Sequence, residues 1–316
     1  MLCFWSFLAW GYGQDIHFSQ NFNLPSQLNP AFLVGTSPFA KLTAATRTQW
    51  SSVTIPYITH FFAAESKLGR TENILNAGIS FASDVAGDGI YRINKAGLRL
   101  AKMLKLKSSS LLFFGIGINQ SSVSYDLSKF KFNNQYANGY QAQLPHGENP
   151  ATDLSLVQFD AGIGMFIQQD KESITLGFSV QNLNTVNYTF YDRNNELGRL
   201  YQGQLAINSR GTEITKEVYV LYGRQQKQDR ILIQGILKPT TGALIPILGL
   251  GFRIQDATII SVGLSGSKWQ GMYSFDINTS RLKQSSHRNG AHELTLIYIF
   301  GLGQKSNQNQ YCPSFI

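Results

Sequence analysis

Residues 157–183 read VQFDAGIGMFIQQDKESITLGFSVQNL, and the alternation within them decides the fold. From Val157 to Ile167 every second residue is apolar, while the residues between them are mostly Gln, Asp and Gly. Only a strand can use a period of two, because its successive side chains point to opposite faces. The alternation returns after the polar turn at 169–172. The stretch is therefore predicted to form a hairpin of two-faced strands.

The same alternation recurs along the chain. It is clear at 110–120, 216–225, 231–238, 257–266, 271–280 and 292–300, and weaker at 39–50, 59–66, 75–83, 94–104, 201–208 and 246–254. Most of these segments have about 9 to 11 residues, the length with which a tilted strand crosses a bilayer. Beyond the first residues no apolar run of about 18 residues occurs, so no membrane-spanning helix is expected.

Many alternating strands fit either a soluble sandwich or propeller or a membrane barrel. Charged residues make up only 15% of the chain, against about 25% in soluble domains. The polar faces carry Gly, Ser, Thr, Gln and Asn, as a lumen does. Aromatic residues that could form interfacial girdles gather at strand ends: Phe113, Phe114, Tyr188, Phe190, Tyr191, Tyr219, Tyr222, Tyr298 and Phe300. We predict an all-β transmembrane antiparallel β-barrel of roughly 12–14 strands over residues 39–300.

The first residues, MLCFWSFLAWGYG at 1–13, are predicted to be a signal peptide that is cleaved before Gln14. Cleavage would leave Cys312 as the one cysteine, so no intramolecular disulfide is expected. An exported barrel belongs in the outer membrane. The polar stretch 301–316 is expected to be a tail at the periplasmic end.

Residues 121–155 form the longest irregular stretch, and they are rich in Asn, Gln and Tyr. A role in gating or contact and a loop without function are both consistent with this composition. The last predicted strand ends in the aromatic pair Tyr298 and Phe300. It resembles the strand that the barrel-assembly machinery recognises in outer-membrane proteins.

Motifs for chemistry are missing from the sequence. The pairs Gly115/Gly117 and Gly162/Gly164 lack the third glycine and the helix of a phosphate loop, and their spacing instead suits a crowded lumen. The five histidines are scattered, and no G-x-S-x-G elbow occurs. The net charge of +8 is spread along the chain without a nucleic-acid motif. We expect no catalytic, cofactor-binding or metal-binding residues, no enzyme activity and no nucleic-acid partner.

Residues 14–35, QDIHFSQNFNLPSQLNPAFLVG, lack any period of two. They resemble the N-terminal signature of the PorP/SprF family of Bacteroidetes type IX secretion system membrane proteins. The matching residues are Gln14, Asp15, His17, Phe18, Ser19, Gln20, Leu28, Asn29, Pro30 and Ala31. Further matches follow in order: Arg47-x-Gln49-Trp50, Asp84-x-Ala86-Gly87-x-Gly89, Gly290-Ala291-His292-Glu293-Leu294 and Cys312-Pro313-Ser314-Phe315. Ile16 and Ala291 depart from the family pattern, which often has proline and serine there.

The resemblance implies a non-enzymatic outer-membrane barrel of the type IX secretion system. Its implied partners are the secretion core and periplasmic ring proteins, the motor, and a large cargo adhesin with a type B C-terminal domain. Some members of the family serve gliding adhesins. Outer-membrane lipid, lipopolysaccharide and the barrel-assembly machinery are the other expected partners.

We predict that residues 14–35 of the N-terminal signature segment at 14–38 fold back into the lumen or its periplasmic mouth, where the segment would act as a plug. Its amides, such as Asn21 and Asn23, would satisfy polar groups of the lumen, and its phenylalanines would anchor it. The residues proposed for partner binding or plugging are His17, Phe18, Ser19, Gln20, Asn29 and Pro30. A disordered periplasmic tail is the alternative structure of this segment.

Two other functions remain open on the sequence. A diffusion channel or hydrophobic-solute transporter would need an open lumen. An outer-membrane hydrolase would need a Ser, a His and an acid brought together at the barrel wall.

Overall fold

A computed structural model describes residues 16–33, 40–51, 55–68, 75–86, 90–107, 109–136, 139–145, 151–191, 195–280 and 289–300. The predicted signal peptide at 1–13, Gln14, Asp15 and the predicted tail at 301–316 with Cys312 lie outside these residues.

Fourteen strands make up the described barrel. They are β1 Ala40–Gln49, β2 Tyr57–Lys67, β3 Leu75–Ala86, β4 Tyr91–Lys107, β5 Ser110–Tyr125, β6 Asp153–Gln169, β7 Glu172–Gln181, β8 Leu200–Arg210, β9 Ile214–Gln225, β10 Gln228–Pro239, β11 Ile245–Arg253, β12 Ala257–Ser265, β13 Trp269–Asn278 and β14 Asn289–Phe300. Short helical turns lie before and between the strands: η1 Asn21–Asn23, α1 Pro25–Leu28, η2 Pro30–Phe32, η3 Leu127–Lys129 and η4 Asn133–Gln135. Among the described residues no helix is long and apolar enough to cross a membrane.

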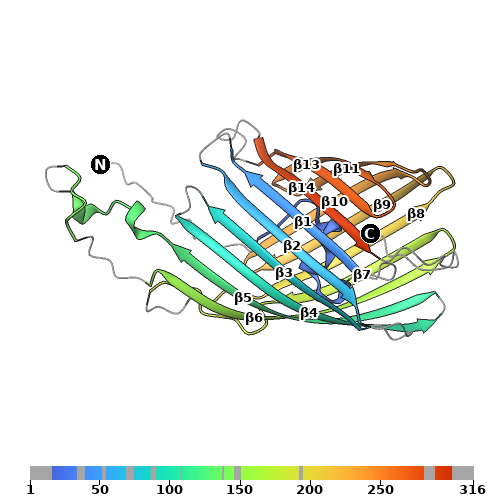
Figure 1. Cartoon of the computed structure of the whole chain (residues 1–316), viewed down its shortest axis with the longest axis horizontal. Coiled ribbons are helices and arrows are strands. Elements are labelled where there is room, and N and C mark those ends of the chain that lie inside the picture. The colour runs from blue at the N-terminus through green and yellow to red at the C-terminus, as the bar shows by residue number, and fades with distance from the viewer. Residues whose placement is uncertain are drawn as a thin grey trace, which may run out of the picture.

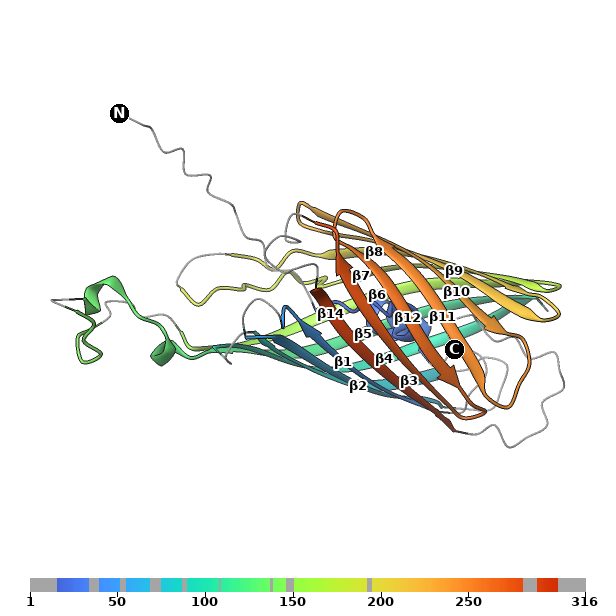
Figure 2. The ribbon, with the colours of Figure 1, turned by 90° about the horizontal axis from the view of Figure 1, so that it is seen from above.

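Every strand pairs antiparallel with its sequence neighbours, and β1 closes the sheet against β14 (Figures 1 and 2). The closing register runs from Ala40 opposite Phe300 to Gln49 opposite Ala291. Closure leaves no unpaired edge in the bilayer, where an unsatisfied backbone group costs several kcal/mol. The predicted closed antiparallel barrel is confirmed.

The two ends of the barrel differ. We call the end where β1 begins and β14 ends the short-turn end, because it carries tight connections such as 170–171. The opposite end is the long-loop end, and its longest connections are 126–152 and 182–199. Figure 1 shows the chain after β5 projecting from the long-loop end.

Three neighbouring strands are longer than the sequence pattern predicted. β4 and β6 have 17 residues each and β5 has 16, so their ends extend towards the long loops. As a result, residues 121–125 and 153–155, which were expected to be irregular, belong to β5 and β6. Their outward residues there are polar, for example Gln120 and Ser122. The apolar outer band therefore ends before the strands do.

The alternation of β6 separates an outer from an inner face as predicted. Val157 and Phe159 face outward and are 42% and 45% exposed, whereas Gln158 and Asp160 face the lumen at 2% and 3%. An exposed apolar band around a barrel is the surface that lipid covers.

Part of the lumen is apolar, because two aromatic residues that were predicted to lie in the interfacial girdles point inward instead. Phe113 and Tyr219, taken from the sequence as girdle residues, are only 1% and 2% exposed and belong to an internal cluster with Phe32 of the N-terminal segment. Because β9 reads VYVLY, apolar on both faces, its pattern could not show which aromatic ring points inward. Side chains therefore fill the lumen near the short-turn end.

Candidate functional site

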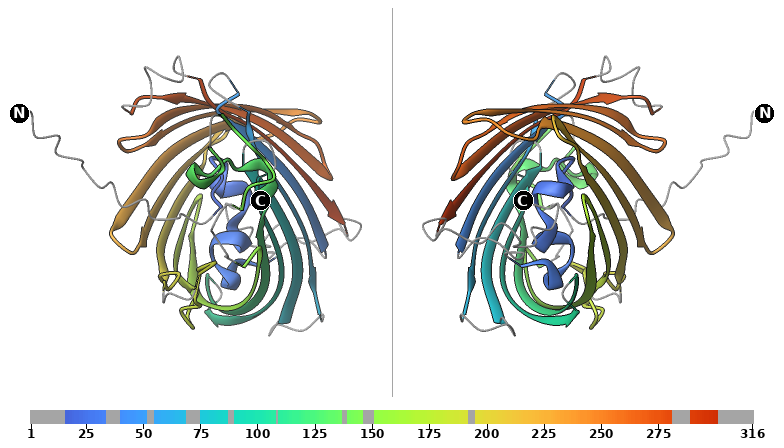
Figure 3. Two further views of the ribbon diagram at one scale, coloured as in Figure 1. Left: turned by 90° about the vertical axis from the view of Figure 1, so that its left-hand side faces the viewer. Right: turned by 90° about the vertical axis from the view of Figure 1, so that its right-hand side faces the viewer.

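The N-terminal segment, residues 16–33, lies inside the barrel (Figure 3). All of its residues are buried except Ile16, His17 and Gln27, which are half-buried. Its first residues lie near the long-loop end, where Phe18 contacts Phe61 of β2 with ring centroids 6.0 Å apart. Its last residue, Leu33, accepts a hydrogen bond from Asn76 near the short-turn end. The segment therefore runs through the lumen from one end of the barrel to the other.

A buried ionic cluster holds the beginning of the segment. Arg47, Arg253, Asp276 and Glu293 project from β1, β11, β13 and β14, and each is at most 7% exposed. Arg47 lies 2.9 Å from Asp276 and 3.1 Å from Glu293, and Arg253 lies 3.2 Å from Asp276. Two cations face two buried carboxylates, and Arg253 also pairs with the more exposed Asp256 at 2.7 Å. Every buried charge of the cluster therefore has an opposite partner, which makes its burial tolerable.

Ser19 and Gln20 complete the ionic cluster. The backbone N–H groups of Ser19 and Gln20 donate to the Glu293 carboxylate at 2.7 and 2.8 Å. The Ser19 hydroxyl donates to Asp276 at 2.7 Å and accepts from Arg47 at 2.6 Å and from Arg253 at 2.5 Å. Charge-assisted bonds of this kind are roughly twice as strong as neutral ones. The cluster thus holds the segment through its backbone as well as through the Ser19 side chain.

Amides extend this attachment along β13. The Gln20 side-chain amide donates to the Met272 carbonyl, the Ser274 hydroxyl and the Glu293 carbonyl, each at 3.2 Å. Asn23 donates to the Gln20 side chain at 2.9 Å and accepts from Gln270. A segment without regular backbone pairing inside a membrane protein must satisfy its polar groups in this way.

The middle of the segment occupies a glycine seat, which we define as Gly115, Gly162, Gly164 and Gly177 of β5, β6 and β7. A Cβ at any of the four would approach Asn29, Pro30, Ala31 or Phe32 more closely than 3.0 Å. Real Cβ atoms essentially never come so close. These glycines therefore create the space that η2 occupies, which explains the Gly162/Gly164 pair. Gly117 of the other pair faces Asp160 and Arg99 instead of the segment.

Asn29 connects the glycine seat to the barrel wall. Its side-chain amide donates to the carbonyls of Ile163 and Phe178 at 3.1 and 3.3 Å, and its side-chain oxygen caps the N–H of Ala31 at 2.9 Å. Pro30 is the first residue of η2, where its missing N–H costs nothing. Asn29 thus caps η2, and Pro30 begins it.

A second ion pair holds the segment towards the short-turn end. Lys41 of β1 lies 3.1 Å from Glu65 of β2, and both side chains are 2% exposed. The Ser26 hydroxyl donates to the same Glu65 carboxylate. On the opposite wall Ser179 and Gln181 of β7 donate to backbone carbonyls at Leu28 and Gln27. The segment is therefore attached to both walls of the barrel.

The residues singled out in the sequence fall into two groups. Phe18, Ser19, Gln20, Asn29 and Pro30 are buried contacts of the segment with the wall, whereas His17 is half-buried near the long-loop end. Tyr298 and Phe300 form a separate pair on the outer face of β14 at the short-turn end. They are each 43% exposed, with ring centroids 4.8 Å apart.

Motifs far apart in the sequence meet at the ionic cluster. Ser19 and Gln20 come from the N-terminal signature, Arg47 from Arg-x-Gln-Trp and Glu293 from the closing strand motif. Sequence reasoning missed Arg253 and Asp276. The available signal was a charge at an inward position of an otherwise apolar strand, which is costly in a membrane unless it is paired.

The described residues contain no group of three or more His, Cys, Asp or Glu side chains that could hold a metal ion. Asp84 of β3 accepts a hydrogen bond from the Thr59 hydroxyl of β2 at 2.5 Å. The charges clustered at Ser19 attach the N-terminal segment to the barrel wall.

Solved structures similar to this chain are outer-membrane barrels. The TodX deltaS2S3 mutant, a monoaromatic hydrocarbon channel, is 8% identical, with a TM-score of 0.53 over 86% of this chain and 92% of that one. A Pseudomonas aeruginosa FadL homologue is 11% identical, with a TM-score of 0.52 over 86% and 93%. The Ralstonia pickettii toluene transporter TbuX is 8% identical, with a TM-score of 0.51 over 87% and 93%. At these identities the likeness establishes the fold alone.

Comparison with curated proteins finds no significant match. The model of one family, described as type IX secretion system membrane protein PorP/SprF, matches residues 11–298. This range includes the N-terminal segment, both ion-pair sites and the whole barrel up to Tyr298. The chain therefore belongs to the PorP/SprF family of type IX secretion system membrane proteins.

Proposed function

We propose that this protein is a closed, non-enzymatic outer-membrane barrel that serves type IX secretion by holding partner proteins. It acts in the secretion or surface attachment of a large adhesin, including gliding adhesins, and docks to the periplasmic ring and motor complex. Family membership supports the secretion role. The observation that carries the closed, partner-holding role is the passage of residues 16–33 through the lumen with attachments on both walls.

The occupied lumen favours a partner-binding barrel over a diffusion channel. A solute crossing the lumen would have to displace a segment held by charged hydrogen bonds at Ser19 and by close packing at the glycine seat. The apolar cluster around Phe113 fills space next to it. The diffusion channel or hydrophobic-solute transporter is the competing function, and a steady current through the native protein is its signature.

The proposed orientation places the short-turn end in the periplasm, since outer-membrane barrels have short periplasmic turns and longer outer loops. The signal peptide at 1–13 is then removed, and the tail at 301–316 starts on the periplasmic side, within reach of the ring and motor. The long-loop end faces lipopolysaccharide and the adhesin. Tyr298 and Phe300 serve recognition by the barrel-assembly machinery.

Within the proposed site the residues divide by burial. His17, half-buried near the long-loop end, is proposed to contact the partner. Phe18, Ser19, Gln20, Asn29 and Pro30 are proposed to act as the plug that shapes the contact surface from below.

Affinity capture from outer membranes tests this proposal. The full-length protein is expected to retain type IX secretion components and one large adhesin, and a deletion of residues 15–30 is expected to lose them. Glu217→Gln is the matched control, because Glu217 is a lumenal carboxylate that pairs with Lys238 of the wall. If the native protein captured no secretion component, the proposed function would be wrong. If a correctly folded deletion variant captured and secreted normally, the role of the segment would be wrong.

A further inference from the structure

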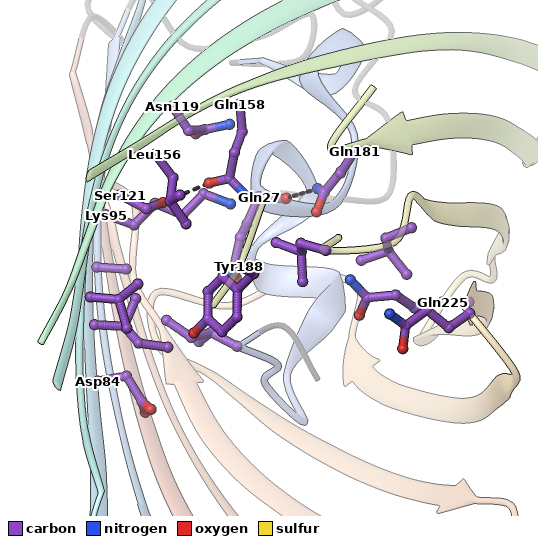
Figure 4. A pocket seen from close by; sticks show the side chains of 18 of the residues that line it. Gln27, Asp84, Lys95, Asn119, Ser121, Leu156, Gln158, Gln181, Tyr188 and Gln225 are labelled. Carbon is purple, nitrogen blue, oxygen red and sulfur yellow. Dashed lines mark hydrogen bonds between the residues drawn. The ribbon is translucent and has the colours of Figure 1, made fainter. Parts of the chain in front are cut away.

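A cavity of about 770 Å³ opens inside the barrel at the long-loop end (Figure 4). Ile16, Gln27 and Leu28 of the N-terminal segment line one side of it. The inner faces of β2 to β10 form its walls, and residues 188–191 and 195–197 line it from the loop between β7 and β8. Its volume lies in the range of about 300–1,000 Å³ that is typical of small-ligand sites.

The buried amides that line this cavity are engaged with other groups of the barrel wall. Gln158 accepts a hydrogen bond from Ser121 and donates one to Asn182, both at 2.6 Å. Asn119 donates to Asp160 at 2.6 Å. Figure 4 shows the bond between Ser121 and Gln158. Asn119 and Gln158 are only 1% and 2% exposed, so these amides build the wall and offer a ligand almost no polar surface.

The charges of the lining cancel. The lining carries three cations and three acids, so its formal charge is zero: Lys95, Arg99, Arg230, Asp84, Glu196 and Asp229. Two of these groups also have partners within the wall, because Arg99 donates to Ser80 and Asp84 accepts from Thr59, each at 2.5 Å. A balanced lining gives no net attraction to an anionic or a cationic ligand.

Carbon makes up most of the surface that faces the cavity. Much of it belongs to six aromatic rings, those of Tyr57, Phe61, Tyr91, Tyr188, Phe190 and Tyr191. Sites for small ligands usually combine such an apolar lining with few polar groups. An apolar ligand that covers this surface releases the water next to it, which is favourable.

Two of the rings come from the β7–β8 loop and are tied to the barrel wall. The hydroxyls of Tyr188 in this loop and Tyr91 of β4 contact each other. Phe190 packs edge-on against Tyr125 of β5, with ring centroids 4.4 Å apart. Rings held in this way lose little freedom when a ligand binds. A ligand ring that packs edge-on or offset against them gains more than its buried area alone supplies.

We propose that this cavity binds an uncharged molecule built on aromatic rings. Gln27 and Leu28 line its inner side, and the chain continues from them into the glycine seat. A bound molecule is therefore held above the N-terminal segment and does not pass through the barrel. This binding differs from the transport of a solute by a channel, and it goes beyond the proposed role in secretion.

Other ligand classes suit this lining less well. A saccharide or a peptide needs donors and acceptors that face it, whereas the buried amides are bonded within the wall. An ion would give up its hydration for a site without net charge, which is costly. A saturated hydrocarbon fits the apolar surface but cannot make the contacts between rings.

Fluorescence of N-phenyl-1-naphthylamine, an uncharged aromatic dye that brightens in apolar surroundings, tests the proposal. The full-length protein is held in lipid nanodiscs, since detergent tails would compete for the cavity, and the signal of empty nanodiscs is subtracted. We expect saturable binding of the dye. At matched free concentrations, biphenyl should displace it about two- to tenfold more strongly than bicyclohexyl, which has the same carbon skeleton without aromatic rings. Biphenyl-4-carboxylate and cellotetraose should be weaker than biphenyl.

Gly223→Trp fills the cavity. Gly223 belongs to the lining on β9, and a Cβ there meets no atom closer than 3.8 Å, so the strand accepts a side chain that extends into the cavity. This variant is expected to weaken dye binding about tenfold or more. Gly203→Trp is the matched control. Gly203 pairs with Tyr222 on the outward face of β8, outside the lining and with no atom within 4 Å of its Cβ, so its variant should bind like the native protein.

The proposal is overturned if the native protein adds no saturable signal to that of nanodiscs alone, or if the carboxylate or cellotetraose displaces the dye more strongly than biphenyl. Equal displacement by bicyclohexyl would also overturn it, because the rings would then not recognise the ligand. If Gly223→Trp bound normally, or if both tryptophan variants lost binding equally with a native heat-modified gel shift, the dye would bind outside the cavity and the proposal would be wrong.

Discussion

Glu293→Gln is the substitution that tests how the segment is held. Glu293 accepts the backbone N–H groups of Ser19 and Gln20 at 2.7 and 2.8 Å. Glutamine keeps the volume and one neutral acceptor but removes the charge. A hydrogen bond to a charged group contributes about 1.5–3 kcal/mol and a neutral one about 0.5–1.5 kcal/mol. The glutamine oxygen keeps one of the two bonds as a neutral bond, while the glutamine NH2 group cannot accept the other, so the change costs about 2.5–4.5 kcal/mol. The ratio of displaced to docked segment then rises roughly 60- to 1,600-fold.

Cysteine accessibility measures this ratio. Asn21→Cys, in a background with Cys3→Ser and Cys312→Ser, places a thiol at a position that is 2% exposed while the segment is docked. A bulky maleimide reacts only when the segment leaves the lumen. When re-docking is faster than labelling, the rate reports the displaced population. We expect the Glu293→Gln variant to label faster by the same factor of roughly 60 to 1,600, an order-of-magnitude figure that follows from one lost and one weakened bond.

Glu217→Gln separates release of the segment from loosening of the barrel. Glu217 is 7% exposed in the lumen and lies 2.6 Å from Lys238. It belongs to β9 and is not part of the ionic cluster that holds Ser19. Its variant should label at the native rate. Equal acceleration in both variants, or no acceleration in Glu293→Gln, would refute the view that the ionic cluster holds the segment.

Three further outcomes are expected. Gly164→Leu should expel the segment without opening the barrel, since a side chain at residue 164 overlaps Phe32 of the segment. Fast maleimide labelling of Asn21→Cys, with an unchanged heat-modified gel shift, would show this. Slow labelling would contradict the glycine seat. Lys41→Met should lower the free energy of unfolding by about 3–5 kcal/mol, because Glu65 keeps a buried charge without its cation. Adding Glu65→Leu should recover much of this loss, as measured by urea unfolding. If the double variant recovered no stability, the Lys41–Glu65 ion pair would not be the cause. An epitope tag inserted before Gln14 should be detected on intact cells, because Ile16 lines the cavity at the long-loop end; detection only after the outer membrane is permeabilised would reverse the orientation.

Local patterns in the sequence were sufficient to predict the barrel wall. The period of two around Val157 and Ile163 identifies the strands and their lipid-facing side because both are properties of neighbouring residues. Strand ends were less predictable. Towards the long loops, β5 and β6 continue with polar outward residues such as Ser122 and Ser155, so an apolar outer face no longer marks them as membrane strands. The inward direction of Tyr219 was not predicted, because β9 is apolar on both faces around this residue.

The sequence pointed to the N-terminal segment of the candidate site, and it did not point to Arg253, Asp276 or the contacts between the segment and the wall. The lack of alternation in 14–35 indicated a segment apart from the wall, and its placement in the lumen followed from the need to satisfy its backbone. The partners of Ser19 lie more than two hundred residues away, at Asp276 and Glu293. No local rule connects such distant charges. The cavity at the long-loop end likewise depends on contacts among many strands.

Single-channel recording in planar bilayers tests the central claim most directly, because that claim is a barrel closed by its own N-terminal segment. The native protein is expected to pass no steady current, while the deletion of residues 15–30 is expected to conduct, with Glu217→Gln silent like the native chain. A steady current through the native protein, unchanged by the deletion, would contradict the account and favour a diffusion channel.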